Sequence, residues 1–75
     1  MKRLDAAKSA YEKAIAADPA CAEAHNNLGV LLAETGKTGD AIEHFRAALR
    51  IRPDYQDAAD NLRIASAAQD GSRIK

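Results

Sequence analysis

The chain has 75 residues with eleven basic and eleven acidic side chains, and its formal net charge of zero argues against nonspecific binding to nucleic acid. The same balance argues against an anionic membrane as partner, and no apolar run approaches the roughly 18–20 residues that span a bilayer. A chain of this length has room for one domain, over residues 1–75. The one cysteine, Cys21, cannot form an internal disulfide, which favours the cytosol.

The predicted elements are helices, because small or apolar residues recur at three- and four-residue spacing and strand patterns are absent. A first helix over residues 4–17 is predicted to end at Asp18 and Pro19, since proline cannot continue the hydrogen-bonded ladder. A second helix over residues 22–34 is predicted to end before Gly36, at a place where a left-handed residue often closes a helix.

The second half of the chain continues the helical pattern. Thr38 is predicted to cap a third helix over residues 40–51, which Pro53 closes. A fourth helix over residues 56–69 is predicted to stop at the Asp-Gly pair that follows it, leaving a frayed tail over residues 70–75. The predicted inward stripe of the second helix is Ala24, Leu28, Leu31 and Leu32. One face of the first helix holds Ala7, Tyr11, Ala14 and Ile15, one face of the third holds Ala41, Phe45, Ala48 and Leu49, and the fourth carries Ala58, Leu62, Ala65 and Ile64.

The two halves of the sequence repeat each other at a distance of 34 residues. Such self-similarity is typical of proteins built from stacked supersecondary units. This shift places Ala7 on Ala41, Tyr11 on Phe45, Ala14 on Ala48, Ile15 on Leu49, Pro19 on Pro53, Ala24 on Ala58, Asn27 on Asn61, Leu28 on Leu62 and Ala33 on Ala67.

Residues 22–55 resemble one complete unit of the tetratricopeptide repeat. Its signature positions hold His25, Leu28, Gly29, Leu32, Ala41, Phe45, Ala48 and Pro53, and only His25 and Leu32 depart from the family's preferred Trp and Tyr. The resemblance implies an all-α fold in which antiparallel helical hairpins stack as a short right-handed α-solenoid. Residues 1–21 look like the second helix of a preceding unit. Residues 56–69 look like a C-terminal capping helix, since Arg63 occupies the place of Gly29.

Small side chains explain the pattern physically. Gly29 and Ala41 let the two helices of the unit approach closely, and Phe45 fills the remaining space. Ala48 then admits the next helix.

The resemblance implies a non-enzymatic protein-interaction scaffold without cofactors, which binds a partner peptide or protein. In the family, extended peptides lie on the concave surface, and acidic residues there favour a basic or neutral ligand. An ordinary solvated face is the alternative interpretation. The residues carried over to the concave surface are Glu23, Asn26, Asn27, Val30, Asp57, Asp60, Asn61 and Ile64.

Two other interpretations remain open. The first helix lacks the helix that would complete its hairpin, so its uncovered face is predicted to pair with another copy as a homodimer or an end-to-end array. The residues predicted for this self-association are Ala7, Ala10, Tyr11 and Ala14. Alternatively, the chain is the tail fragment of a larger repeat-containing protein or enzyme.

Neither a metal site nor a catalytic site is predicted. Cys21 and His25 stand four residues apart and can share a helix face, but two ligands are too few for zinc, and His44 falls on another helix. A cysteine–histidine nucleophilic pair is not expected either, because no orienting group or oxyanion site accompanies it. His25 is interpreted as a packing substitute for the family's Trp.

Overall fold

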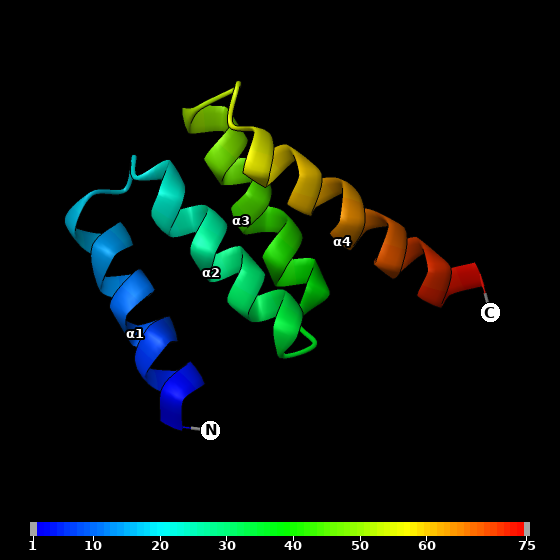
Figure 1. The fold of residues 1–75 in the computed structure, drawn as a ribbon, viewed down its shortest axis with the longest axis horizontal. Coiled ribbons are helices and arrows are strands. Elements are labelled where there is room, and N and C mark those ends of the chain that lie inside the picture. The colour runs from blue at the N-terminus through cyan, green and yellow to red at the C-terminus, as the bar shows by residue number, and fades with distance from the viewer. Residues whose placement is uncertain (1, 75) are drawn as a thin grey trace.

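The computed structural model describes the backbone of residues 2–74 and the side chains of residues 5–69. Within this range every regular element is a helix, which confirms the all-α prediction. Successive helices run antiparallel, and α4 ends farthest from the rest of the molecule (Figure 1). The helices are α1 (Lys2–Ala17), α2 (Ala22–Glu34), α3 (Thr38–Ile51) and α4 (Gln56–Ile74).

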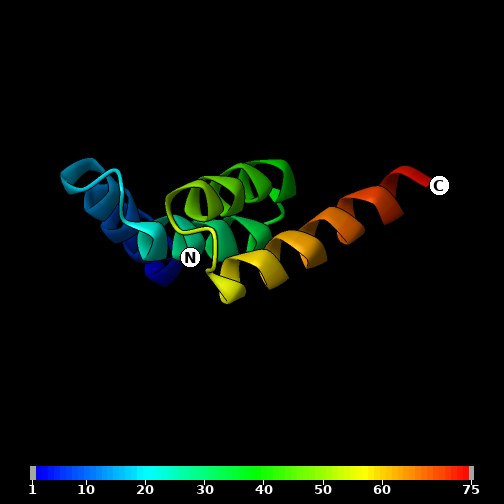
Figure 2. The same ribbon diagram turned by 90° about the horizontal axis from the view of Figure 1, so that it is seen from above.

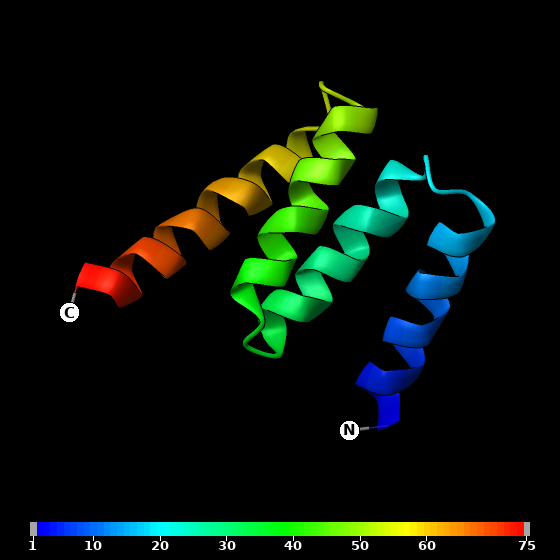
Figure 3. The same ribbon diagram turned by 180° about the vertical axis from the view of Figure 1, so that it is seen from behind.

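The molecule is a thin slab of 40 × 33 × 14 Å in which the helices follow one another in chain order. Figure 2 shows the slab from its edge, and Figure 3 shows from behind that α2 and α3 lie between α1 and α4. The α2–α3 pair has the most extensive contact, as expected for the hairpin of one repeat unit. In the part of the chain that the structure describes, no helix is both long and apolar enough to cross a membrane.

Gly36 closes α2 as predicted, because its backbone adopts a φ of +87° that other residues avoid. The Gly36 N–H donates to the carbonyl of Ala33 at 3.2 Å, and the Lys37 N–H donates to that of Leu32 at 2.8 Å. These two bonds form a Schellman motif. The turn that follows α2 therefore satisfies two of the backbone carbonyls that a helix end otherwise leaves unpaired.

Three predicted helix boundaries are wrong, and the first is the start of α1, which lies at Lys2 and not at residue 4. Thr38 does not cap α3 but is its first residue, because the Ala41 N–H already donates to the carbonyl of Lys37 at 3.0 Å, and Lys37 makes no side-chain cap bond. The fourth helix does not stop at residue 69 but runs to Ile74. A glycine inside a helix costs only about 1 kcal/mol relative to alanine, and no proline follows it to enforce an end.

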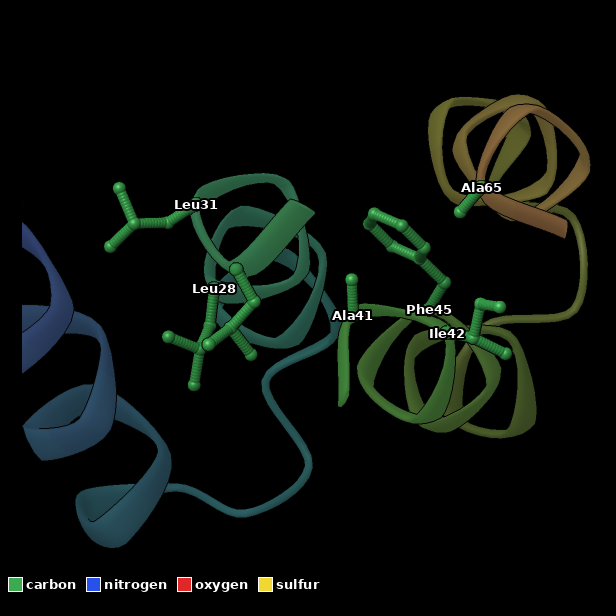
Figure 4. Close-up of a cluster of buried hydrophobic side chains, with 7 residues drawn as sticks. Leu28, Leu31, Ala41, Ile42, Phe45 and Ala65 are labelled. Atoms are coloured by element: carbon green, nitrogen blue, oxygen red, sulfur yellow. The ribbon is translucent and has the colours of Figure 1, made fainter. Parts of the chain in front are cut away.

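The centre of the hairpin confirms the predicted role of small residues. A Cβ added to Gly29 would lie 2.5 Å from Cε1 of Phe45, so the ring packs directly on the α2 backbone. Phe45 is only 1% exposed and Ala41 is fully buried. In Figure 4 the Phe45 ring points from α3 into the space between α2 and α4, with Ala65 beside it. The absence of a side chain at Gly29 therefore creates the space that this ring fills.

The end of α3 packs through a second, smaller cluster. Its centre consists of Ala22, Ala48 and Ala58, one residue from each of three helices, and the latter two are fully buried. Leu49 and Tyr55 cover this cluster and are half-buried. Ala48 therefore admits the following helix as predicted.

The first helix packs on one side only. Figure 4 shows Leu31 pointing from α2 toward α1, where Ala7, Tyr11 and Ile15 meet the core in half-buried positions. Ala14, predicted to share their face, is exposed. Among the described residues α1 packs against α2 alone, whereas α3 packs against both α2 and α4. The side chains of α1 can therefore be buried against one neighbouring helix, and those of α3 against two.

Candidate interaction surface

The molecule carries an apolar groove between α2 and α4, with a volume of about 270 Å³. We call it the α2–α4 groove. The ring of Phe45 forms its bottom, and side chains of α2 and α4 form its walls. Its lining residues are Val30, Ala33, Glu34, Thr38, Phe45, Asn61, Ile64, Ala65 and Ala68.

Helical periodicity explains why these residues face one another. Val30, Ala33 and Glu34 are spaced three and four residues apart and therefore lie on one side of α2. The four lining residues of α4, from Asn61 to Ala68, follow the same spacing. Figure 1 shows α4 diverging from α2 toward the C-terminus.

Ile64 gives the groove its most accessible apolar surface. It is 63% exposed, because α4 turns its Ala58 and Ala65 side toward α3, and Ile64 lies beside that line. Its place in the lining of the groove is compatible with the predicted concave surface.

The eight residues predicted for the concave surface are placed unevenly. Val30, Asn61 and Ile64 line the α2–α4 groove. Four others lie outside its lining: Glu23, Asn27 and Asp57 are exposed, and Asp60 is half-buried. Asp60 accepts a hydrogen bond from Gln56 at 3.0 Å and pairs with Arg63 at 3.4 Å, so part of its charge is already compensated within α4.

The prediction for Asn26 is wrong, because this residue is only 6% exposed and cannot line a binding surface. Its Oδ1 accepts a hydrogen bond from Nδ2 of Asn61 at 3.0 Å. The bond links α2 to α4 next to the groove and satisfies a buried amide. Asn26 therefore positions the two walls relative to each other.

The structure brings His25 and His44 together, which sequence reasoning missed. Their Nδ1 atoms are 3.2 Å apart and their rings stack with centroids at 5.4 Å. His25 also places Nε2 3.1 Å from the carbonyl of Pro19. Because that carbonyl can only accept, Nε2 of neutral His25 carries the hydrogen, and its Nδ1 accepts from Nδ1–H of His44. His25 thus connects the α1–α2 loop to α3.

This histidine pair does not extend to a metal site in the described part of the chain. Among those residues no group of three or more His, Cys, Asp or Glu side chains is placed to hold an ion. Cys21 is half-buried and its carbonyl accepts the N–H of His25 at 3.2 Å.

The surface predicted for self-association divides into two kinds of position. Ala10 and Ala14 are exposed on α1. Ala7 and Tyr11 are half-buried and pack against the α2 core, so only part of each side chain is accessible to another copy.

A comparison with models of known protein families agrees with this geometry. A model described as the tetratricopeptide repeat matches residues 1–56, a range that contains α1, α2 and α3. Helix α4 begins at the end of that range, and the 34-residue shift relates it to α2.

Proposed function

The chain belongs to the tetratricopeptide repeat family, and we propose that it is a non-enzymatic module that binds an extended segment of a partner protein in the α2–α4 groove. The observation that supports this proposal is the exposure of Ile64 beside Val30 and above the ring of Phe45. Covering apolar surface contributes roughly 25 cal/mol per Å², so a side chain inserted here gains from contacts on three helices.

The groove also offers polar groups to the backbone of a bound segment. The Thr38 hydroxyl and the Asn61 amide lie in its lining, at its α3 and α4 sides. Asn61 uses one N–H for Asn26, which leaves its carbonyl oxygen as an acceptor. An apolar bottom with a few polar groups at its edges is the usual composition of a site that binds a side chain and orients the chain carrying it.

The test uses the two large apolar side chains that are exposed among the described residues. Peptides are selected from a random phage-displayed library on the wild-type chain, and their affinities are measured for Ile64→Asp and for Ile51→Asp. We expect Ile64→Asp to weaken binding by about tenfold or more, as for the loss of a central contact. Ile51 is 38% exposed at the end of α3 and lies outside the groove. The Ile51→Asp variant is therefore the matched control and should bind the peptides as tightly as the wild type.

Circular dichroism must show both variants to be as helical as the wild type. If the selected peptides bind the Ile64→Asp variant as tightly as they bind the wild type, their binding site lies outside the groove and the proposal is contradicted.

A second candidate function is self-association through α1. It is favoured by the contrast between exposed Ala14 and its repeat equivalent Ala48, which is fully buried between neighbouring helices. Ala14→Arg should then convert a dimer into a monomer in sedimentation experiments at high micromolar concentration. A wild-type chain that is monomeric at this concentration rules the candidate out. Tyr11→Glu is less suitable, because Tyr11 packs on the α2 core.

A further inference from the structure

Basic side chains are scarce on the two helices that flank the groove. Residues 22–34 and 56–69 carry four carboxylates, those of Glu23, Glu34, Asp57 and Asp60, against the single basic Arg63. This is an excess of three negative charges. The other described side chains, in residues 5–21 and 35–55, hold six acidic and six basic groups. Although the whole chain has zero net charge, the described side chains of the two helices that flank the groove therefore carry a net negative charge.

Three of these carboxylates lie in line with the apolar contacts of the groove. On α2, residues spaced four, three and four apart share one face, and the same spacing on α4 gives an equivalent row. Glu34 itself lines the groove. The two rows are Glu23, Asn27, Val30 and Glu34 on α2, and Asp57, Asn61, Ile64 and Ala68 on α4.

The position of Glu34 is unfavourable for the stability of α2. It is in the last turn of α2, where the helix dipole presents its negative end and where no basic residue offsets it. No Lys or Arg within residues 5–69 forms an ion pair with it. Asp57 and Glu23, by contrast, lie in first turns, where a negative charge stabilises the helix. Helix stability accounts for those two positions but not for Glu34.

Resting on the proposed function, we infer that the segment bound in the α2–α4 groove is cationic, with an apolar side chain next to Lys or Arg. The apolar side chain contacts Val30, Phe45 and Ile64, and the neighbouring cation pairs with Glu34 at the end of the groove. Asp57 lies toward the other end of the same face and attracts a second cation. A negative surface of this kind also raises the rate at which a cationic segment associates and repels an acidic one.

The experiment uses the phage-selected peptides that define the proposed function. We expect Lys or Arg next to an aliphatic or aromatic residue to be enriched among peptides that lose binding to Ile64→Asp. The tightest such peptide is then titrated against Glu34→Gln and Glu34→Lys. Glu34→Gln should weaken binding by about fivefold, the scale of one partly exposed ion pair, and Glu34→Lys should weaken it further. Raising the salt concentration should reduce the affinity of the wild type more than that of Glu34→Gln.

The matched control is Glu43→Gln, which removes the same charge from an exposed position on α3. It should leave the affinity unchanged. Glu34→Lys places a positive charge at the C-terminus of α2, so its thermal stability should equal or exceed that of the wild type while its binding falls. A loss of binding together with a loss of stability would mean a damaged fold and would count against the inference.

Three outcomes show whether the inference fails alone or together with the proposed function. Selected peptides that need Ile64 but lack basic residues, and bind Glu34→Gln as well as wild type, overturn the cationic partner and leave the groove as the binding site. Failure to select any peptide that needs Ile64 overturns both. A wild-type dimer that Ile64→Asp dissociates in sedimentation also overturns the inference, because the occupant is then a second copy of the chain.

Discussion

The junction of α3 with α4 and the junction of α1 with α2 occupy equivalent places in the 34-residue repeat, yet they bury different surfaces. Ala48 is fully buried whereas its equivalent Ala14 is exposed. Phe45 is 1% exposed whereas Tyr11 is half-buried. The difference arises because α3 is packed from two sides and α1 from one. Equivalent residues therefore differ in energetic importance according to their neighbours.

The largest expected effect comes from truncating the two equivalent aromatic residues. Phe45→Ala should lower the free energy of unfolding by about 3–5 kcal/mol, because it empties the contact among α2, α3 and α4. Tyr11→Ala should cost about 1 kcal/mol, since its side chain is partly solvated in the folded state. Urea unfolding followed by circular dichroism measures both. Equal costs would mean that α1 and α3 are buried alike.

The next effect concerns Gly29 and its equivalent Arg63. Gly29→Ala should lower the free energy of unfolding by about 1–3 kcal/mol, because the added Cβ overlaps the Phe45 ring, and the cost of displacing this ring outweighs alanine's better helix propensity. Arg63→Ala should stay within about 0.5 kcal/mol of wild type, since its ion pair with Asp60 is largely exposed.

Gly39→Ala provides the control for helix propensity. A Cβ there would approach nothing nearer than Nε2 of Gln69 at 3.6 Å, so this variant should gain up to about 1 kcal/mol. Destabilisation of Gly29→Ala and Gly39→Ala by the same amount would contradict a specific overlap with Phe45.

A third pair of equivalent positions holds the polar residues Asn61 and Asn27. Asn61→Ala should cost about 1–3 kcal/mol, because it leaves the buried Oδ1 of Asn26 without its donor. Asn27→Ala, at the equivalent but exposed position, should change the free energy of unfolding by less than about 0.5 kcal/mol. The two variants are compared by thermal unfolding. If both are neutral, the link between α2 and α4 does not stabilise the fold.

The sequence predicts most of the fold because its signals are local or periodic. Pro19 and Pro53 mark helix ends through their restricted backbone, and Gly36 does so through its freedom to adopt a positive φ. The 34-residue shift identifies the residues that pack at the centre of the hairpin, and Gly29, Ala41 and Phe45 are found there. The end of α4 could not be predicted in this way, since a glycine without a following proline only weakens a helix.

The candidate surface is less predictable, because its details depend on how the helices cross. The family resemblance placed both Asn26 and Asn27 on the concave surface, but the approach of α4 buries the first and leaves the second exposed. The contact between His25 and His44 joins residues 19 positions apart on different helices. Neither contact has a local sequence signal. Both follow from the close approach of helices that small residues permit.

The smallest expected effect is a pH dependence of the folding stability. It arises in the α2–α3 hairpin alone, because the repeat equivalents of His25 and His44 are Ala59 and Ala10. Burial and the nearby His25 lower the pKa of His44 below its ordinary value of 6.5, although the carboxylates of Asp40, Glu12 and Glu43 oppose this shift.

Because the folded state binds the proton of His44 less readily than the unfolded state, the associated stability is complete above pH 6.5 and is lost as the pH falls through the lowered pKa. The thermal midpoint of the wild type should therefore decrease when the pH is lowered from about 7.5 to about 5.5, a range in which most exposed carboxylates stay ionised. His44→Gln should show a flatter dependence over the same interval. An equally steep decrease in that variant would assign the effect to other groups and leave the histidine contact without a role in stability.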